Sequence, residues 1–311
     1  MLVLKRTMRI LITGGAGFIG GHLAAACQSI GQVRVLDDLS TGYRASLNGL
    51  DVDFHQGCIT DPQAVAVAMV GVDLVFHLAA FVSVPASLAE PLKCARLNVN
   101  GLLTVLEAAE KAGVRRVVLA SSAAIYGDDP MVPKVESMPP QPRSPYALTK
   151  LDGEFYCDLY AQRGRITTAC ARFFNVFGPR QRPDSAYAAA VPKFISNAVS
   201  GEPMVIYGDG EQTRDFIFVG DVVDGLLHLA LRMKLGGVFN LGYGKATSVN
   251  YLADQICTLT GSKVPRIHEP ERAGDVRHSV ASIDRIRSTG WQPRHTLESG
   301  LAETTSWFQN R

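Results

Sequence analysis

Tyr146 and Lys150 are the residues whose types and spacing point most directly to chemistry. They lie four positions apart in Pro145-Tyr-Ala-Leu-Thr-Lys150, and proline suits the first turn of a helix. Positions i and i+4 of a helix share one face, so the phenol and the ammonium come close together. A phenol has a pKa of about 10 and is a poor base at neutral pH, but a neighbouring cation favours its ionised form. The pair therefore predicts a tyrosine that acts as general acid and base.

A buried strand is expected to bring a third polar group to this pair. Val117-Val-Leu-Ala-Ser-Ser122 is apolar until it ends in two serines. Open α/β sheets carry their sites at the carboxyl ends of their strands. We therefore expect the hydroxyl of Ser122 to share a site with Tyr146 and Lys150.

A glycine-rich loop near the start of the chain predicts a dinucleotide site. Thr13-Gly-Gly-Ala-Gly-Phe-Ile-Gly20 separates an expected strand at 9–13 from an expected helix at 18–30. Glycines at 14, 17 and 20 permit a tight turn, close approach of a pyrophosphate and close packing of the helix on the strand. The pyrophosphate would then meet the helix N-terminus, where unpaired N–H groups favour anions.

Asp37 closes the next expected strand, about 20 residues further on, where a carboxylate can bind the ribose hydroxyls. The same carboxylate would repel the 2′-phosphate of NADP, so NAD is the expected cofactor. An oxidised nicotinamide ring is cationic and would also favour the phenolate of Tyr146.

The order of strands and helices predicts an α/β fold with a parallel, doubly wound sheet. Short apolar runs alternate with stretches of helical spacing, which is typical of βαβ units. The expected strands are 9–13, 32–36, 73–78, 117–120, 167–173 and 238–241, and the expected helices include 18–30, 191–199 and 219–231. We predict a Rossmann domain over residues 1–175, which 216–242 rejoin, and a smaller discontinuous α/β domain formed by 176–215 and 243–311.

Composition excludes several classes of partner. Residues are 47% hydrophobic, and 31 Lys and Arg against 29 Asp and Glu give a formal charge of only +2. Nucleic acids and anionic membranes require a surplus of basic charge, so neither is an expected partner. No apolar run reaches the length of about 18 residues that a membrane span needs. The six cysteines lack metal-ligand spacing, so we expect no metal and a cytoplasmic location.

These motifs resemble those of the extended short-chain dehydrogenase/reductases. The resemblance is carried by the glycine loop, by Tyr146 and Lys150, and by Ser122 in Ser122-Ala-Ala-Ile-Tyr-Gly127. Three further stretches are similar to the NAD-dependent nucleotide-sugar 4-epimerases: Arg172-Phe-Phe-Asn-Val-Phe-Gly-Pro179, Gly208-Asp-Gly-Glu-Gln-Thr-Arg-Asp215 and Arg272-Ala-Gly-Asp-Val-Arg-His-Ser279. Nearly the whole chain is covered. The resemblance implies a Rossmann domain that binds NAD, a smaller C-terminal domain that binds a UDP-sugar, and a homodimer.

The resemblance also implies a role for each matching position. The residues implied to bind NAD are Gly14, Gly17, Phe18, Ile19, Gly20, Asp37, Asp38, Thr41, Cys58, Ile59, Leu78, Ala79, Ala80, Tyr146, Lys150 and Phe174. The residues implied to bind the UDP-sugar are Ser122, Tyr146, Asn175, Tyr207, Arg214, Arg272, Asp275 and Ser279. Of these, Arg214 and Arg272 would hold the two phosphates, for which a planar fork of donors is suited.

The implied reaction inverts C4 of a UDP-hexose through a 4-keto sugar. Tyr146 removes the proton of the 4-hydroxyl while NAD takes the hydride from C4. Ser122 hydrogen-bonds the same oxygen, and Lys150 holds the ribose and lowers the pKa of the phenol. The keto sugar then rotates and takes the hydride back on its other face.

Three departures from related enzymes bear on the reaction and the substrate. Ala123 and Ala124 follow Ser122, where related dehydratases and decarboxylases carry acidic residues, so those reactions are not expected. Ser279 stands at a gate position where a bulky tyrosine tends to exclude acetamido sugars, which favours UDP-GlcNAc and UDP-GalNAc, with UDP-Glc and UDP-Gal also accepted. Cys58 replaces an aspartate that often binds the adenine, and a thiol is a weak partner.

Two other interpretations remain open at this point. Arg277-His278-Ser279 also resembles a subgroup that acts on UDP-N-acetylglucosamine and its uronic acid, so a UDP-uronic-acid 4-epimerase is one alternative. A non-catalytic NAD-binding module is the other, although a pure sensor has no need of a base such as Tyr146.

Overall fold

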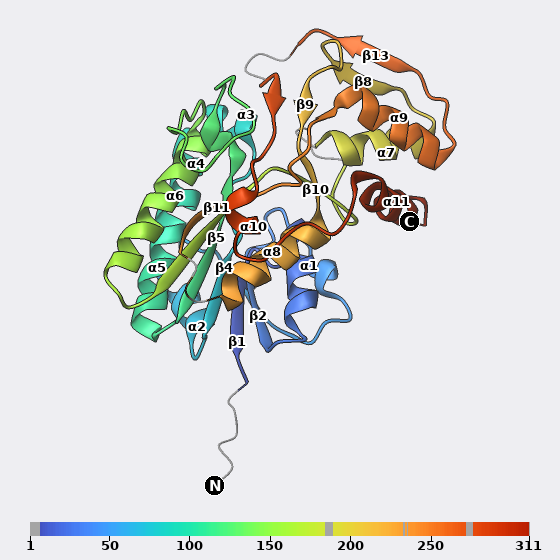
Figure 1. Ribbon diagram of the computed structural model, residues 1–311. Helices are drawn as coiled ribbons and strands as arrows, with labels where there is room; N and C mark the ends of the chain where they lie inside the picture. The colour runs from blue at the N-terminus through green and yellow to red at the C-terminus, as the bar shows by residue number, and fades with distance from the viewer. Residues whose placement is uncertain (1–6, 184–188, 233, 235, 272–275, 311) are drawn as a thin grey trace. The chain divides into compact units, whose positions relative to one another are not determined.

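The computed structural model describes residues 7–183, 189–232, 234, 236–271 and 276–310 (Figure 1). The chain divides into two compact units, each assembled from three separate segments. The first unit comprises Met1–Ser121, Ser144–Ala171 and Leu226–Val238, and the second comprises Ser122–Arg143, Arg172–Gly225 and Phe239–Arg311.

The segment 122–143 groups with the second unit, whereas our predicted boundaries kept it with residues 1–175. Its backbone explains the grouping. The N–H of Lys134 donates to the carbonyl of Val280 at 2.7 Å, and the N–H of Ser282 donates to the carbonyl of Lys134 at 2.8 Å. These bonds tie the segment 122–143, which contains five prolines, to the C-terminal part of the chain.

A seven-stranded sheet forms the framework of the first unit, although its residues 122, 172–173 and 239–241 group with the second unit. Its order is β11-β6-β5-β4-β1-β2-β3, and parallel pairings join β3 to β2, β2 to β1, β1 to β4 and β4 to β5. The strands are β1 (Arg9–Thr13), β2 (Gln32–Asp37), β3 (Val52–Gln56), β4 (Leu74–His77), β5 (Arg116–Ser122), β6 (Thr167–Phe173) and β11 (Gly237–Leu241). Because the order reverses at β1, the sheet is doubly wound, and the predicted fold class is confirmed.

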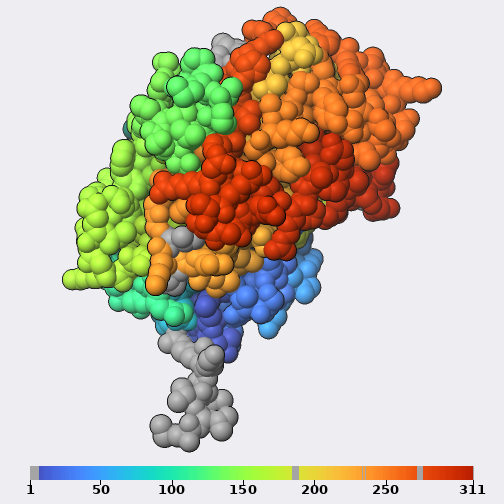
Figure 2. All heavy atoms as spheres, in the orientation of Figure 1, coloured from blue at the N-terminus to red at the C-terminus, as the bar shows by residue number. Residues whose placement is uncertain are grey.

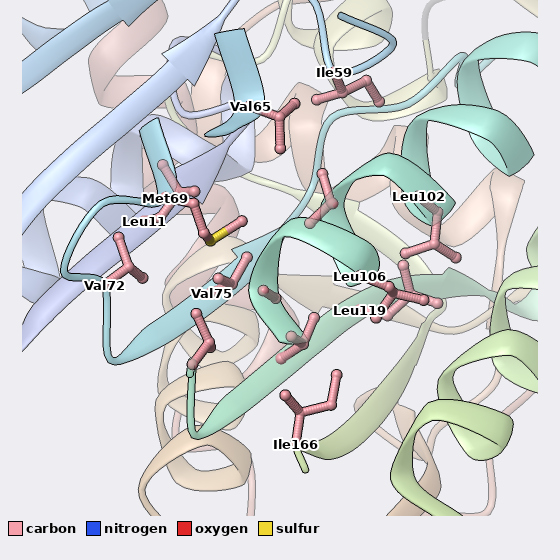
Figure 3. Close-up of a cluster of buried hydrophobic side chains, with 14 of the residues drawn as sticks. Leu11, Ile59, Val65, Met69, Val72, Val75, Leu102, Leu106, Leu119 and Ile166 are labelled. Atoms are coloured by element: carbon pink, nitrogen blue, oxygen red, sulfur yellow. The ribbon is translucent and has the colours of Figure 1, made fainter. Parts of the chain in front are cut away.

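Three helices bury their apolar faces on this sheet. They are α2 (Pro62–Met69), α5 (Gly101–Ala112) and α6 (Pro145–Gln162). Figure 3 shows Val65 and Met69 of α2 and Leu106 of α5 pointing toward Val75 of β4 and Leu119 of β5, all of them buried. Each such side chain contributes about 1.5–3 kcal/mol on burial, so this cluster holds the strands in register.

The other helical elements of this unit are short, apart from α1 (Phe18–Cys27). They are η1 (Arg44–Leu47), α3 (Val84–Ala89), α4 (Pro91–Ala95) and the π-helical segment η2 (Arg96–Asn100). Our prediction that the first helix runs to Ile30 is wrong. The N–H of Ile30 bonds the carbonyl of Cys27 at 3.0 Å, so the chain leaves the helix in a tight turn before β2.

The second unit has three small sheets, with strand orders β10-β7, β12-β9-β14 and β13-β8. These strands are β7 (Asn175–Phe177), β8 (Met204–Tyr207), β9 (Thr213–Arg214), β10 (Phe216–Phe218), β12 (Thr247–Ser248), β13 (Arg266–Glu269) and β14 (His278–Ser279). Its helical elements are η3 (Ala123–Tyr126), α7 (Ala190–Ser200), α9 (Val249–Thr260), α10 (Asp284–Arg287) and α11 (Leu297–Gln309). Figure 2 shows the orange and red C-terminal segments of this unit at its surface.

One further helix, α8 (Val219–Leu231), continues from the second unit into the first along the chain. The predicted helix 219–231 has these bounds and is confirmed. Across the described residues, no helix combines the length and the apolar character needed to cross a bilayer.

Candidate active site

The glycine loop packs too tightly for a side chain at Gly14 or at Gly20. A Cβ on Gly14, whose φ is +73°, would lie 2.6 Å from the backbone nitrogen of Ala79, and a Cβ on Gly20 would lie 2.2 Å from the carbonyl oxygen of Gly14. Gly17 is the N-cap of α1 and provides no side-chain cap. The first N–H groups of α1, at Phe18 and Ile19, therefore point out of a bare backbone cradle of the kind that binds a pyrophosphate.

Asp37 joins the end of β2 to this cradle. Its carboxylate accepts the N–H of Ala16 at 2.9 Å and the N–H of Leu39 at 2.8 Å. Burial raises the pKa of this carboxyl group, and the two N–H bonds oppose that rise. Each carboxylate oxygen keeps a second lone pair with which to accept a ribose hydroxyl. The residues thus fit the adenosine half of NAD.

The other residues predicted to contact adenosine differ in their exposure. Asp38 and Thr41 are exposed, and the Asp38 carboxylate accepts the N–H of Ser40 at 2.9 Å. Cys58 lies with its sulfur 3.2 Å from the hydroxyl of Thr60, and Ile59 is buried in the core of the first unit. Contacts of these residues with adenosine stay a prediction.

A buried histidine fixes the segment expected to edge the nicotinamide. Nδ1 of His77 lies 2.8 Å from the hydroxyl oxygen of Thr13, and burial lowers the pKa of His77 to about 3, so its ring is neutral. The N–H groups of Leu78 and Ala79 both donate to the carbonyl of Thr13, at 3.1 and 3.0 Å. Residues 78–80 are therefore held against the end of β1, beside the glycine loop.

The predicted catalytic pair, Tyr146 and Lys150, lies at the start of α6, as its spacing predicts. Ser144 caps this helix by accepting the N–H of Ala147 at 3.1 Å. The ammonium of Lys150 donates to the carbonyl of Ala120 at 2.7 Å and lies 5.8 Å from the ring centroid of Tyr146. Burial lowers the pKa of Lys150 to about 8. The half-buried phenol thus has a buried cation beside it, as general acid-base chemistry requires.

Glu154 and Ser121 also belong to the surroundings of Lys150. Ser121 was expected at the end of the strand but was given no role, and Glu154 was not predicted. The Ser121 hydroxyl donates to Oε1 of Glu154 at 2.6 Å, and both side chains are buried. The Glu154 carboxylate raises the pKa of Lys150 and partly offsets the effect of burial. A signal was present, because Glu154 follows Lys150 by one helical turn.

Ser122 ends β5 and also begins the η3 turn. Its hydroxyl oxygen accepts the N–H of Ala124 at 3.2 Å. An acceptor role for the oxygen leaves the hydroxyl proton to be donated elsewhere. The position is the carboxyl end of a strand, as predicted.

In the second unit the structure places two predicted substrate residues side by side. Ser279 of β14 and Arg214 of β9 are paired in register on parallel strands. The N–H of Asn175 on β7 donates to the carbonyl of Asp215 at 2.9 Å, which brings this residue next to Arg214 in the fold. Tyr207 ends β8, and Phe174 is buried directly before β7. Arg272 and Asp275 lie outside the described residues.

Asp215 is a further residue whose role was not predicted from the sequence. Its buried carboxylate accepts the N–H groups of Tyr243, Gly244 and Ala281, at 2.6, 2.9 and 3.0 Å. Burial raises its pKa to about 6. It joins the strand of Arg214 to the segment that follows Ser279.

Comparison with known proteins identifies the family. Residues 10–242 match the model of the NAD dependent epimerase/dehydratase family. The chain belongs to this family. NAD is its cofactor, and both the predicted cofactor and the predicted resemblance are confirmed. In this family member the cradle of Gly14 and Gly20, and the carboxylate of Asp37, are the groups that fit the dinucleotide.

Similar members of the family cover nearly the full length of the chain. A UDP-glucose 4-epimerase of Mycolicibacterium smegmatis is 38% identical over 98% of this chain and 99% of its own length. A UDP-N-acetylglucosamine 4-epimerase structure from Methanobrevibacter ruminantium is 36% identical with a TM-score of 0.94, covering 97% of this chain and 98% of that chain. A UDP-glucose 4-epimerase structure from Thermotoga maritima is 37% identical with a TM-score of 0.93, covering 97% and 99%.

Proposed function

We propose that this enzyme is a UDP-sugar 4-epimerase that inverts C4 of a UDP-hexose through a transient 4-keto sugar. The substrate pair that the residues favour is UDP-GlcNAc and UDP-GalNAc, with UDP-Glc and UDP-Gal as further substrates. The proposal is supported by similarity to epimerases of both kinds at nearly equal identity. The choice between acetamido sugar and plain hexose is carried by Ser279.

The observation that carries the reaction type is the short turn after Ser122. Ser122 presents a hydroxyl, and the next two residues of the turn are alanines. Alanine has no group that exchanges protons, so nothing in these two positions can act at C5 or C6 of the sugar. Such a turn therefore supports chemistry that is confined to the 4-oxygen and C4 of the sugar.

The roles of the chain's residues follow from their surroundings. Tyr146 takes the proton of the 4-hydroxyl and later returns it. Lys150, held on the carbonyl of Ala120, provides the positive charge that favours the phenolate. Ser122 donates its hydroxyl proton to the 4-oxygen, while its own oxygen accepts the N–H of Ala124. When bound, NAD supplies the acceptor and donor of the hydrogen at C4.

The predicted substrate residues are suited to bind a diphosphate and to leave space for more than one sugar. Arg214 provides a guanidinium suited to a phosphate, and Ser279, its partner across the strands, has a small side chain. A small residue there leaves space for the acetamido group at C2. Arg272 and Asp275 complete the proposed set.

We further propose that the enzyme is a cytoplasmic homodimer. On α6, the side chains of Leu148, Phe155 and Leu159 are exposed, with Phe155 at 59%. Positions separated by seven and four residues lie on one helix face. An exposed apolar face of this kind fits a second copy of the chain.

A panel of UDP-sugars tests the proposal. The purified enzyme is incubated with UDP-GlcNAc, UDP-Glc or UDP-glucuronate in D2O without added reductant, and the products are resolved by NMR. We expect interconversion of 4-epimers with no deuterium at C4, because the hydrogen that leaves C4 returns without meeting solvent. Equilibration of UDP-glucuronate alone would favour the uronic-acid alternative. Failure to convert any of the three would refute the proposed function.

A further inference from the structure

The turn that follows Ser122 is anchored by a buried tyrosine. Tyr126 is the last residue of η3 and is 1% exposed. Its hydroxyl donates to Oδ1 of Asn240 at 2.6 Å, across 114 positions of the sequence. The turn that begins at Ser122 therefore ends on a hydrogen bond to β11.

Asn240 is held by hydrogen bonds from its backbone N–H and from its side-chain amide. Its amide nitrogen donates to the carbonyls of Lys134 at 2.9 Å and Ser282 at 3.0 Å, and its backbone N–H donates to the carboxylate of Glu136 at 2.8 Å. The side chain is completely buried. An amide offers one acceptor oxygen and two N–H donors, and here the two donors and the oxygen are all engaged. The amide oxygen that accepts the hydroxyl of Tyr126 cannot rotate away unless the hydrogen bonds to the carbonyls of Lys134 and Ser282 also break.

Arg172 holds the same tyrosine from another side. Its guanidinium lies 4.8 Å from the centroid of the Tyr126 ring and hydrogen-bonds the hydroxyl. Burial raises the pKa of Tyr126, so the phenol stays protonated and remains a donor to Asn240. The tyrosine is thus a structural donor, in contrast to the proposed acid-base role of Tyr146.

The rest of the turn is also constrained. The carbonyl of Ile125 accepts the N–H of Gln141 at 2.9 Å. Gly127 has a φ of +59°, and a Cβ there would lie 2.0 Å from the carbonyl oxygen of Gln141. Because its end is fixed, the turn determines the direction of the N–H of Ala124. This N–H donates the hydrogen bond that the hydroxyl oxygen of Ser122 accepts.

We propose that Tyr126 and Asn240 are positioning residues that orient the hydroxyl of Ser122 through the η3 turn. The same asparagine binds the carbonyl of Ser282, three residues after Ser279, so one side chain ties the turn of the reacting serine to the segment of the sugar gate. The inference rests on the proposed function, in which Ser122 donates to the 4-oxygen of the sugar.

The test is a double-mutant cycle on the holoenzyme with UDP-GlcNAc and UDP-Glc. Tyr126→Phe removes one hydroxyl and keeps the ring. We expect kcat to fall about tenfold, the loss typical of one buried hydrogen bond, with KM changed by less than about twofold. In the Ser122→Ala background the same substitution should leave kcat unchanged, because the group that Tyr126 positions is already absent.

Tyr160→Phe is the matched control. The Tyr160 hydroxyl donates to Oε1 of Glu107 at 2.5 Å near the far end of α6, in the first unit. Its loss removes a comparable bond and should lower the unfolding temperature without changing kcat. Bound NAD and the unfolding temperature are measured for each variant. Should Tyr126→Phe not fold, Asn240→Asp replaces it, since that side chain keeps its shape but loses the donors to Lys134 and Ser282.

The outcomes separate this inference from the function on which it rests. If Tyr126→Phe lowers kcat by the same factor in the wild-type and Ser122→Ala backgrounds, Tyr126 does not act through Ser122. That result overturns the positioning role but does not affect the proposed epimerase function. Full activity of Tyr126→Phe does the same. A wild-type enzyme that converts no UDP-sugar, or a fully active Ser122→Ala variant, overturns the proposed chemistry and this inference with it.

Discussion

Replacing the buried Lys150 by methionine should stabilise the folded protein while removing its activity. The pKa of this lysine falls from its usual 10.5 to about 8 in the fold, mainly through burial. At pH 7 this fall in pKa corresponds to about 3 kcal/mol of destabilisation. Methionine fills a similar volume without a charge but leaves the carbonyl of Ala120 without its donor, at a cost of about 1 kcal/mol. The net expectation is a gain of about 2 kcal/mol in the free energy of unfolding.

This destabilisation has a defined pH dependence. The unfolded chain keeps the Lys150 proton up to pH 10.5, whereas the folded chain loses it at about pH 8. Between these values the unfolded state binds more protons, so the stability of the wild type rises with pH. The advantage of Lys150→Met should therefore shrink as pH rises from 8 to 10.5. Cys27, whose pKa burial raises to about 12, titrates in both proteins and cancels in the difference.

Urea denaturation of the nucleotide-free proteins at pH 7, 8.5 and 10 measures both effects. Lys93→Met is the control, because Lys93 is half-exposed and pairs with Glu90 at 3.0 Å. Exposed pairs of this kind contribute less than about 1 kcal/mol, so the control should change stability little and equally at each pH. A Lys150→Met protein no more stable than wild type at pH 7, or an advantage that does not vary with pH, would refute the reasoning.

Four further substitutions test other parts of the structure. Tyr146→Phe should lower kcat by about 10²–10⁴-fold with NAD still bound, and near-normal turnover would remove Tyr146 as the base. Gly20→Ala places a Cβ 2.2 Å from the carbonyl oxygen of Gly14, so the purified protein should lose its nucleotide absorbance; retained NAD would contradict the tight cradle. Ser279→Tyr should lower kcat/KM for UDP-GlcNAc about tenfold more than for UDP-Glc. If kcat/KM falls equally for both substrates, Ser279 does not select between the two sugars. Phe155→Asp should give monomers by light scattering if α6 forms the dimer face, and an unchanged mass argues against that face.

The parts of the fold that could be predicted are those in which local pattern and tertiary environment agree. The strands at 9–13 and 167–173 and the helix at 219–231 have the predicted bounds because their apolar residues face the core at regular spacing. The β3 strand, Val52–Gln56, was not predicted. It lies at the edge of the sheet, carries polar residues and has no fully buried side chain, so its sequence shows no strand pattern.

The same distinction applies to the site. Tyr146, Lys150 and the glycine loop were found because each motif is contiguous in the sequence. Asn240 and Asp215 were missed because they act through hydrogen bonds to segments that are distant in the chain, as in the bond from Tyr126 to Asn240. Short-range spacing carries no information on such partners.

The position of β6 in the sheet has a consequence for synthesis of the chain. β5 has six of its seven residues buried, and β6, which comes after the proline-rich loop and α6, covers its outer edge. Until residue 173 has left the ribosome, β5 presents an open row of backbone donors and acceptors with apolar side chains on both faces, which is a template for aggregation. The interval between residues 122 and 173 lasts about 3–10 s at ordinary translation rates. We therefore expect early docking of the α6 helix on β5 to lower the risk of aggregation during these seconds.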